Sequence, residues 1–129
     1  MSVGRAEVWI DVPPSEVWEW IKAFDGIDRW MPGIDSLSID GDDRTIEMLG
    51  MKIKEHLVQI NDTQMSTTYS IVDGVPVDSH KATISVEGSG KGSKVVWEVS
   101  VSPDEMLPVF ESTYQVALEH LAKLFSEPA

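Results

Sequence analysis

A strand that leads into a long helix is predicted within residues 94–125, KVVWEVSVSPDEMLPVFESTYQVALEHLAKLF. Apolar and polar residues alternate along most of 94–102, which is typical of a strand with one buried face. Ser102 and Glu105, three residues apart, have the spacing of a helical capping box, and Pro103 suits a first helical position. The stretch therefore predicts the last strand of a sheet followed by a helix.

The predicted helix has one apolar face. Pro108 would interrupt a helix that began at the capping box, so we expect the helix to begin near Pro108, after a separate turn. Apolar side chains then recur at helical spacing. They are Phe110, Tyr114, Ala117, Leu121 and Leu124, with Leu118 and Phe125 widening the stripe. This face has to be buried against another element.

The residues before this helix are predicted to form an antiparallel meander. Turn signals recur about every ten residues, which is typical of strands joined by hairpins. The turns are Gly41-Asp42-Asp43, Gly50, Asn61-Asp62, Asp73-Gly74 with Pro76, and Gly88 to Gly92. They bound six predicted strands, at about 34–40, 44–49, 52–60, 65–72, 77–87 and 94–102.

The N-terminal part adds one more strand and two short helices. Residues 5–12 alternate between apolar and polar side chains, which predicts the first of seven strands. Pro13 and Pro14 end this strand, and Pro14 suits the first turn of a helix. Gly26 ends that helix, and a second short helix is expected before Pro32.

Length and composition restrict the classes of function. The chain has 129 residues, so we expect 1–129 to form a single α+β domain. Its formal charge of −12 argues against nucleic-acid and membrane partners. It has no cysteine, which excludes disulfides, thiolate metal sites and a cysteine nucleophile. Because it has neither a membrane-spanning apolar run nor a secretory leader, we expect a cytoplasmic protein.

Several stretches of the sequence resemble one known family. They are VPPSEVW at 12–18, FDGIDRWMPG at 24–33, EHL at 55–57, Asp62, YSIV at 69–72, Pro76-Val77, VWE at 96–98, and Leu118 with Leu121. In this order they resemble the polyketide cyclase/dehydrase-like proteins of the START-like (SRPBCC) superfamily, which includes the birch-pollen-allergen-like proteins. The resemblance implies a helix-grip fold. In that fold a curved, seven-stranded antiparallel sheet surrounds a long C-terminal helix, and two short helices follow the first strand.

Three polar side chains are expected on the concave face of the sheet, because alternate residues of a strand share a face. They are Glu55, Tyr69 and His80, each on the same face as apolar neighbours. As a catalytic set, Glu55 and His80 would shuttle a proton while Tyr69 holds a carbonyl oxygen. The alternative is that Glu55 and His80 hydrogen-bond each other and only line a pocket. The resemblance implies that all three positions line the ligand cavity, as in the related plant abscisic-acid receptors.

Further residues are expected to contact a ligand. They lie at the predicted cavity mouth, on the concave face of the sheet or on the apolar face of the last helix. They are Trp30, Met31, Ile53, Leu57, Thr67, Ile71, Ala82, Glu98, Phe110, Tyr114 and Ala117. A metal site would need His80, Glu55 and Glu98 in one shell, but no ligand-spacing motif supports it. No metal and no cofactor are therefore predicted.

Two arguments disagree about Glu98. Apolar alternation places Val95, Trp97, Val99 and Val101 on one face, which favours an inward Trp97 and an outward Glu98. The resemblance instead implies that Glu98 points toward the cavity, and we follow it in the prediction. Trp97 and Trp9 would then meet on the convex face, where exposed aromatic side chains would favour a homodimer. The facing of Glu47 is left open, because Ile46 and Met48 compete with Thr45 and Leu49 for the interior.

Two functions from different classes agree with these features. The first is a cofactor-independent enzyme that binds a small hydrophobic, carbonyl-bearing metabolite and cyclises, dehydrates or hydrates it by acid–base chemistry. The second is a non-catalytic protein that binds or carries such a molecule. The resemblance supports both, because the superfamily includes cyclases, hydratase-like enzymes, lipid carriers and receptors.

Overall fold

A computed structural model describes residues 2–126 of the chain. Its elements in order are β1 (Ser2–Ile10), α1 (Pro14–Ile21), the 3-10 helix η1 (Phe24–Arg29), β2 (Ser36–Asp40), β3 (Asp43–Met48), β4 (Met51–Asn61), β5 (Ser66–Asp73), β6 (Ser79–Ser89), β7 (Gly92–Ser102), the 3-10 helix η2 (Asp104–Met106) and α2 (Leu107–Ser126). The predicted α+β class and order of elements are confirmed.

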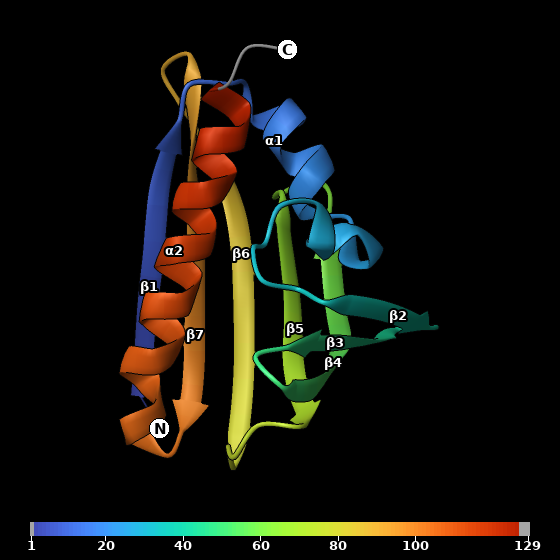
Figure 1. The fold of residues 1–129 in the computed structure, drawn as a ribbon. Helices are drawn as coiled ribbons and strands as arrows, with labels where there is room; N and C mark the ends of the chain where they lie inside the picture. Colours follow the sequence, from blue (N-terminus) through green and yellow to red (C-terminus); the bar gives the residue numbers. More distant parts are fainter. Residues whose placement is uncertain (1, 127–129) are drawn as a thin grey trace.

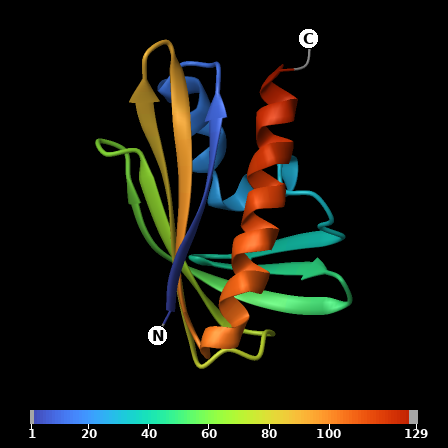
Figure 2. The same ribbon diagram turned by 90° about the vertical axis from the view of Figure 1, so that its left-hand side faces the viewer.

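The seven strands form one curved antiparallel sheet. Their order across the sheet is β1-β7-β6-β5-β4-β3-β2, so β1 and β2 are its two edges. The long helix α2 lies against the face of β1 and β7 (Figure 1). Seen from the side, β2, β3 and β4 curl toward the side on which α2 lies (Figure 2). This is the helix-grip arrangement that the family resemblance implies.

Part of the core lies where α2 crosses β7. Alternate residues of β7 are buried under the helix: Val95, Trp97, Val99 and Val101. The indole of Trp97 stacks on the ring of Tyr114, with centroids 3.8 Å apart and planes within 4° of parallel. Because a large aromatic side chain buries much apolar area and stacks favourably, this pair contributes strongly to holding α2 on the sheet.

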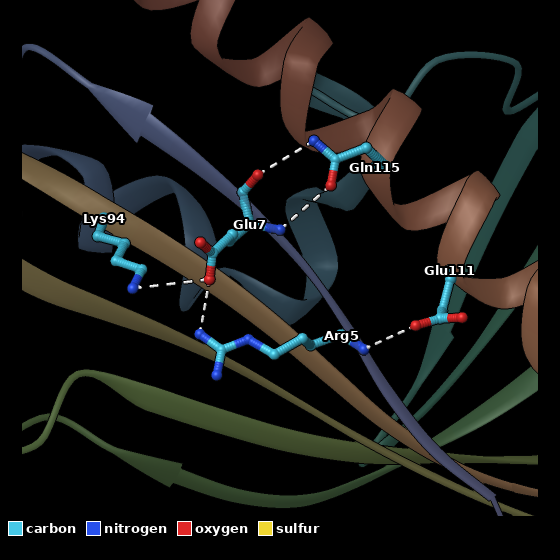
Figure 3. Close-up of polar contacts among 5 residues, drawn as sticks. All are labelled: Arg5, Glu7, Lys94, Glu111 and Gln115. Atoms are coloured by element: carbon cyan, nitrogen blue, oxygen red, sulfur yellow. Dashed lines mark hydrogen bonds and ion pairs between the residues drawn. The ribbon is translucent and has the colours of Figure 1, made fainter.

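The edge strand β1 is covered by side chains of α2 (Figure 3). The backbone N–H of Arg5 donates to Glu111 Oε2 at 3.2 Å. The amide of Gln115 accepts from the N–H of Glu7 at 3.2 Å and donates to the carbonyl of Glu7 at 3.0 Å. Gln115 thus pairs with β1 as a neighbouring strand would, which satisfies edge groups that could otherwise recruit a second sheet.

The predicted facing of Glu98 is wrong. Glu98 is exposed, whereas Trp97 is completely buried. In the β1–β7 register Ala6 pairs with Trp97, while Trp9 pairs with Lys94. Trp9, which is 51 % exposed, therefore lies on the opposite face of the sheet from Trp97. Burying the indole of Trp97 and three valines is favourable, whereas burying the carboxylate of Glu98 instead would be costly. Because Trp9 and Trp97 lie on opposite faces, the predicted dimer surface formed by these two residues does not exist.

The structure tests two predictions about the start of the last helix. The capping box of Ser102 and Glu105 is wrong, because the chain passes through the separate turn η2, which has no side-chain cap. The expected start near Pro108 is confirmed, since α2 begins at Leu107. Among the helices of residues 2–126, none is both long and apolar enough to cross a lipid bilayer.

Candidate ligand-binding site

A cavity of about 340 Å³ lies between α2 and the strands β3, β4 and β5. Its wall is mainly apolar, with a few polar side chains. The lining residues are Ile27, Met31, Ile46, Met48, Leu49, Met51, Ile53, Glu55, Tyr69, Ile71, Val75, Pro76, Met106, Val109, Phe110, Thr113 and Tyr114. Its size and lining are those of a pocket for a small organic molecule.

The β5–β6 loop closes one side of this cavity, through Val75 and Pro76. Gly74 makes this possible, because it has a positive φ of 97° and lies directly against the backbone carbonyl of Lys52. A β-carbon at position 74 would collide with that carbonyl. Only glycine therefore allows the loop to pack so closely on β4.

Glu55 is one polar group of the cavity wall, and Arg44 holds it in place. The two residues are paired across β3 and β4, and their exposed fractions are 6 % and 3 %. Nε and Nη2 of Arg44 both lie 2.7 Å from Oε1 of Glu55, and Nη1 donates to the carbonyl of Phe24 at 2.8 Å. The guanidinium also lies over the Phe24 ring, 4.1 Å from its centroid. Each of the three guanidinium nitrogens of Arg44 thus contacts an oxygen of the protein.

The second carboxylate oxygen of Glu55 remains available to a ligand. Both bonds from Arg44 go to Oε1, and Oε2 has no hydrogen-bond partner among the described residues. Burial raises the pKa of Glu55, and the charge and hydrogen bonds of Arg44 oppose this rise without cancelling it. Glu55 therefore offers the cavity an acceptor whose proton affinity is increased.

Tyr114 is the second polar group, and its hydroxyl joins two other side chains. The hydroxyl of Tyr69 donates to the Tyr114 oxygen at 3.0 Å. Nε2 of His80 lies 2.9 Å from the same oxygen. Burial raises the pKa of both phenols, and the charge of Glu55 adds to the rise, so both remain protonated at neutral pH.

The tautomer of His80 follows from its other ring nitrogen. The backbone N–H of Ile71 donates to Nδ1 at 3.1 Å, so Nδ1 carries no proton. Burial lowers the pKa of His80 to about 4, which keeps the ring neutral at pH 7. The single proton is then on Nε2 and is donated to Tyr114. The Tyr114 oxygen accepts two hydrogen bonds, and its own proton is left without an acceptor among residues 2–126.

The predicted site residues divide into two groups. The main cavity is lined by Glu55, Tyr69, Met31, Ile53, Ile71, Phe110 and Tyr114. It is not lined by His80, Trp30, Leu57, Thr67, Ala82, Glu98 or Ala117. His80 lies behind Tyr114 and is not hydrogen-bonded to Glu55, so the alternative in which these two side chains hydrogen-bond each other is wrong.

Two of the remaining residues line a second, smaller cavity. Trp30 and Thr67 border a space of about 10 Å³ next to Arg44 and Tyr69. Trp30 is buried edge-on against Trp97, with centroids 5.7 Å apart. It therefore acts as a core residue rather than bordering the cavity mouth.

Sequence reasoning missed Arg44 and the hydrogen-bonding role of Tyr114. Arg44 shares its strand face with Ile46 and Met48, which are both buried, so fixing the parity of β3 would have placed it inside. That parity also places Glu47 on the outer face, where its carboxylate accepts from Ser36 at 2.8 Å. Within the described part of the chain, no group of three or more His, Cys, Asp or Glu side chains could hold a metal ion.

Comparison with known proteins agrees with this geometry. Residues 2–126 match the family model for polyketide cyclase / dehydrase and lipid transport. The chain belongs to this family. No curated protein matches the chain significantly.

Solved structures with the same fold extend the comparison. The protein XoxI from Bacillus cereus is 29 % identical with a TM-score of 0.91, over 97 % of this chain and 96 % of that one. A putative uncharacterized protein from Bacillus thuringiensis is 26 % identical with a TM-score of 0.90, over 98 % and 100 %. Ara h 8.0201 shares the fold at 14 % identity with a TM-score of 0.75, over 96 % and 97 %. The family and the fold support ligand binding by this family member.

Proposed function

We propose that this family member binds a small, mainly apolar organic molecule with a carbonyl group in the cavity between α2 and β3, β4 and β5. The observation that carries the proposal is the cavity itself, about 340 Å³ of space with an apolar wall and the polar groups Glu55 and Tyr114. Apolar contacts would supply most of the binding free energy, and the polar groups would fix the orientation of the ligand.

Filling the cavity tests this proposal. Ile71 lines the cavity, whereas the next residue of β5, Val72, is exposed. Ile71→Trp should abolish the binding of 2-acetylnaphthalene, a small aromatic ketone, because the larger ring occupies its space. Val72→Trp adds the same ring outside and should bind like the wild type. Fluorescence titration measures both, with circular dichroism as the folding control.

Two results would count against ligand binding in this cavity. One is a wild-type protein that binds neither 2-acetylnaphthalene nor 2-ethylnaphthalene. The other is an Ile71→Trp variant that is folded and still binds the ketone with unchanged affinity, because the ligand would then lie elsewhere.

A second candidate function is acid–base catalysis on the bound molecule, including a lyase-type dehydration, a hydration or a cyclisation. Its specific support is the increased pKa of Glu55, a residue of the cavity wall whose Oε2 has no hydrogen-bond partner among the described residues. Glu55 would remove a proton from the carbon beside the ligand carbonyl, and the Tyr114 proton would stabilise the enolate oxygen. Glu55 would then return the proton. Tyr69 and His80 would act through Tyr114 as positioning residues.

Deuterium exchange tests the catalytic proposal with a simple ketone. In D₂O, the wild type should speed exchange of the methyl protons of 2-acetylnaphthalene, followed by NMR. Glu55→Gln should lower this rate by about 10²–10⁴-fold, the usual contribution of a general base. His80→Phe should lower the rate while leaving its pH dependence unchanged, because His80 does not itself take the proton. A wild type that binds the ketone without speeding exchange would leave the carrier function in place.

Two broader expectations accompany these functions. The chain is proposed to be one START-like domain over 1–129, of which Met1 and residues 127–129 lie outside the described residues. Its location in the cytoplasm stays a prediction.

A further inference from the structure

Building on the proposed function, we propose that the cavity selects neutral ligands with a hydrogen-bond-accepting oxygen, such as ketones, and rejects carboxylates of the same size. The charge of the cavity wall and the direction of its free hydrogen-bond donor would together determine this selection.

The charge of the wall excludes anions. Glu55 is the only Asp, Glu, Lys or Arg among the described residues that line the cavity. Its partner Arg44 lies behind it, with Nε, Nη1 and Nη2 all engaged by Glu55 and Phe24. A ligand carboxylate would therefore enter an apolar space beside a carboxylate and without a cation of its own. Such burial is costly, because both like-charge repulsion and desolvation oppose it.

The donor in the wall is Tyr114. Its oxygen already accepts hydrogen bonds from Tyr69 and from His80, so only its own proton is free. The wall has one other hydroxyl besides the two tyrosines, that of Thr113, but it donates to the carbonyl of Val109 at 2.8 Å. Tyr114 thus presents a donor of fixed direction to a ligand oxygen. A ketone or another uncharged acceptor satisfies this donor without bringing a charge into the cavity.

Three naphthalenes of similar size separate these effects at pH 8: 2-acetylnaphthalene, 2-naphthoate and 2-ethylnaphthalene. For the wild type we expect the ketone to bind about tenfold more tightly than the hydrocarbon, the usual upper range for one neutral hydrogen bond. The naphthoate should bind at least about tenfold more weakly than the ketone, because its charge has no partner. Calorimetric or fluorescence titration measures all three.

Two variants assign the selectivity to its residues. Tyr114→Phe should remove the preference for the ketone over the hydrocarbon, keep the affinity for the hydrocarbon, and raise the infrared carbonyl frequency of the bound ketone. Thr113→Val is the matched control, because its hydroxyl is already bonded to the backbone, and it should keep the preference. Glu55→Gln should increase naphthoate affinity by about tenfold or more, since it removes one negative charge and releases that of Arg44.

The outcomes distinguish this inference from the proposed function on which it rests. If 2-ethylnaphthalene binds and the naphthoate binds as tightly as the ketone, the cavity is a ligand site but the inference is wrong. It is also wrong if Tyr114→Phe keeps the ketone preference or if folded Glu55→Gln gains no affinity for the naphthoate. If none of the three compounds binds, both fail. A gain of naphthoate binding in Glu55→Gln would be strong support, because partial unfolding does not create a selective gain.

Discussion

On the side that faces β1 and β7, side chains of α2 are hydrogen-bonded to the backbone of β1 (Figures 1 and 3), and Tyr114 stacks on Trp97. On the side that faces β3, β4 and β5, α2 instead borders a cavity of about 340 Å³. The first side is the closed side and the second the open side. On the open side, the connection from the strands to the helix passes through the hydroxyls of Tyr69 and Tyr114.

This difference explains how the fold keeps a cavity without losing the helix. The closed side anchors α2 through Glu111 and Gln115 and through the ring of Trp97, so the helix does not need to pack tightly on the open side. A sheet that curled further would fill the space with its own side chains. The strands β2, β3 and β4 curl toward the side of α2 (Figure 2), and a cavity lined by Met31, Met48 and Phe110, among others, remains between the helix and β3, β4 and β5.

Breaking the aromatic anchor should have the largest effect on stability. Trp97→Ala should lower the free energy of unfolding by about 3–5 kcal/mol, the usual cost of removing a buried indole. Trp9→Ala should cost about 1 kcal/mol or less, because half of this side chain is exposed. Urea unfolding of both variants measures the difference. Equal effects would contradict the placement of the two tryptophans on opposite faces.

Acid should lower the free energy of unfolding through His80, which joins β6 to Tyr114 of α2. Its pKa falls from 6.5 to about 4 on folding, so the unfolded chain binds the proton more tightly. The stability that neutral His80 provides is complete above about pH 6.5 and is lost as the pH falls toward 4, by about 3 kcal/mol in total. Glu55 contributes with the opposite sign, since burial raises its pKa.

Two histidine variants isolate the contribution of His80 to the pH dependence of stability. Between about pH 4 and pH 6.5, the free energy of unfolding of His80→Gln should depend less on pH than that of the wild type. His56→Gln is the control, because His56 is an exposed histidine paired with Asp43. If His80→Gln retains the full wild-type slope, His80 is not buried in its neutral form.

Removing the strand-like pairing of Gln115 should have a smaller effect. Gln115→Ala deletes two hydrogen bonds to the backbone of Glu7 and should cost about 1–2 kcal/mol. Hydrogen exchange of the Glu7 amide should become faster, while the amides of β6 keep their protection. Glu119→Ala, which removes only a side-chain contact with Gln115, should leave that exchange unchanged. Unchanged exchange in Gln115→Ala would show that the closed side does not depend on this pairing.

The smallest predicted effect concerns the open side. Leu49 is 80 % exposed and has a positive φ of 52°, a conformation that asparagine adopts more readily than leucine. Leu49→Asn should therefore increase the unfolding free energy slightly, by about 0.5 kcal/mol, within the usual range for surface changes. A clear loss of stability would mean that the Leu49 side chain makes packing contacts that its 80 % exposure does not suggest.

The sequence predicted most of the fold because its signals are local. Alternation, turns and the apolar face of the last helix each depend on residues close in the chain, and they placed the seven strands and α2 correctly. The facing of Glu98 was predicted wrongly because the resemblance was preferred to the alternating pattern, which places Trp97 and three valines on one face. The alternation gives the correct facing, because burying three valines and an indole on one face is strongly favourable and places Glu98 in solvent.

The candidate site could be predicted only in part. Parity placed Glu55, Tyr69 and His80 on the inner face of their strands, where all three are buried. Parity does not give the position of α2 above the sheet, and that position puts Tyr114 between His80 and the cavity. Arg44 was missed because the parity of β3 depends on where its turn lies. The positive φ of Leu49 places Leu49 in the turn, and Ile46 and Met48 then face inward with Arg44.

An NMR structure of the chain with 2-acetylnaphthalene bound would show directly where the ligand lies. We expect intermolecular NOEs from the ligand to Ile53, Ile71 and Phe110, with the ketone oxygen beside the Tyr114 hydroxyl. A ligand that instead contacts the surface groove of Trp9, Ala122 and Phe125 would contradict this placement. So would a protein in which the ketone shows no NOE to any residue of the cavity wall.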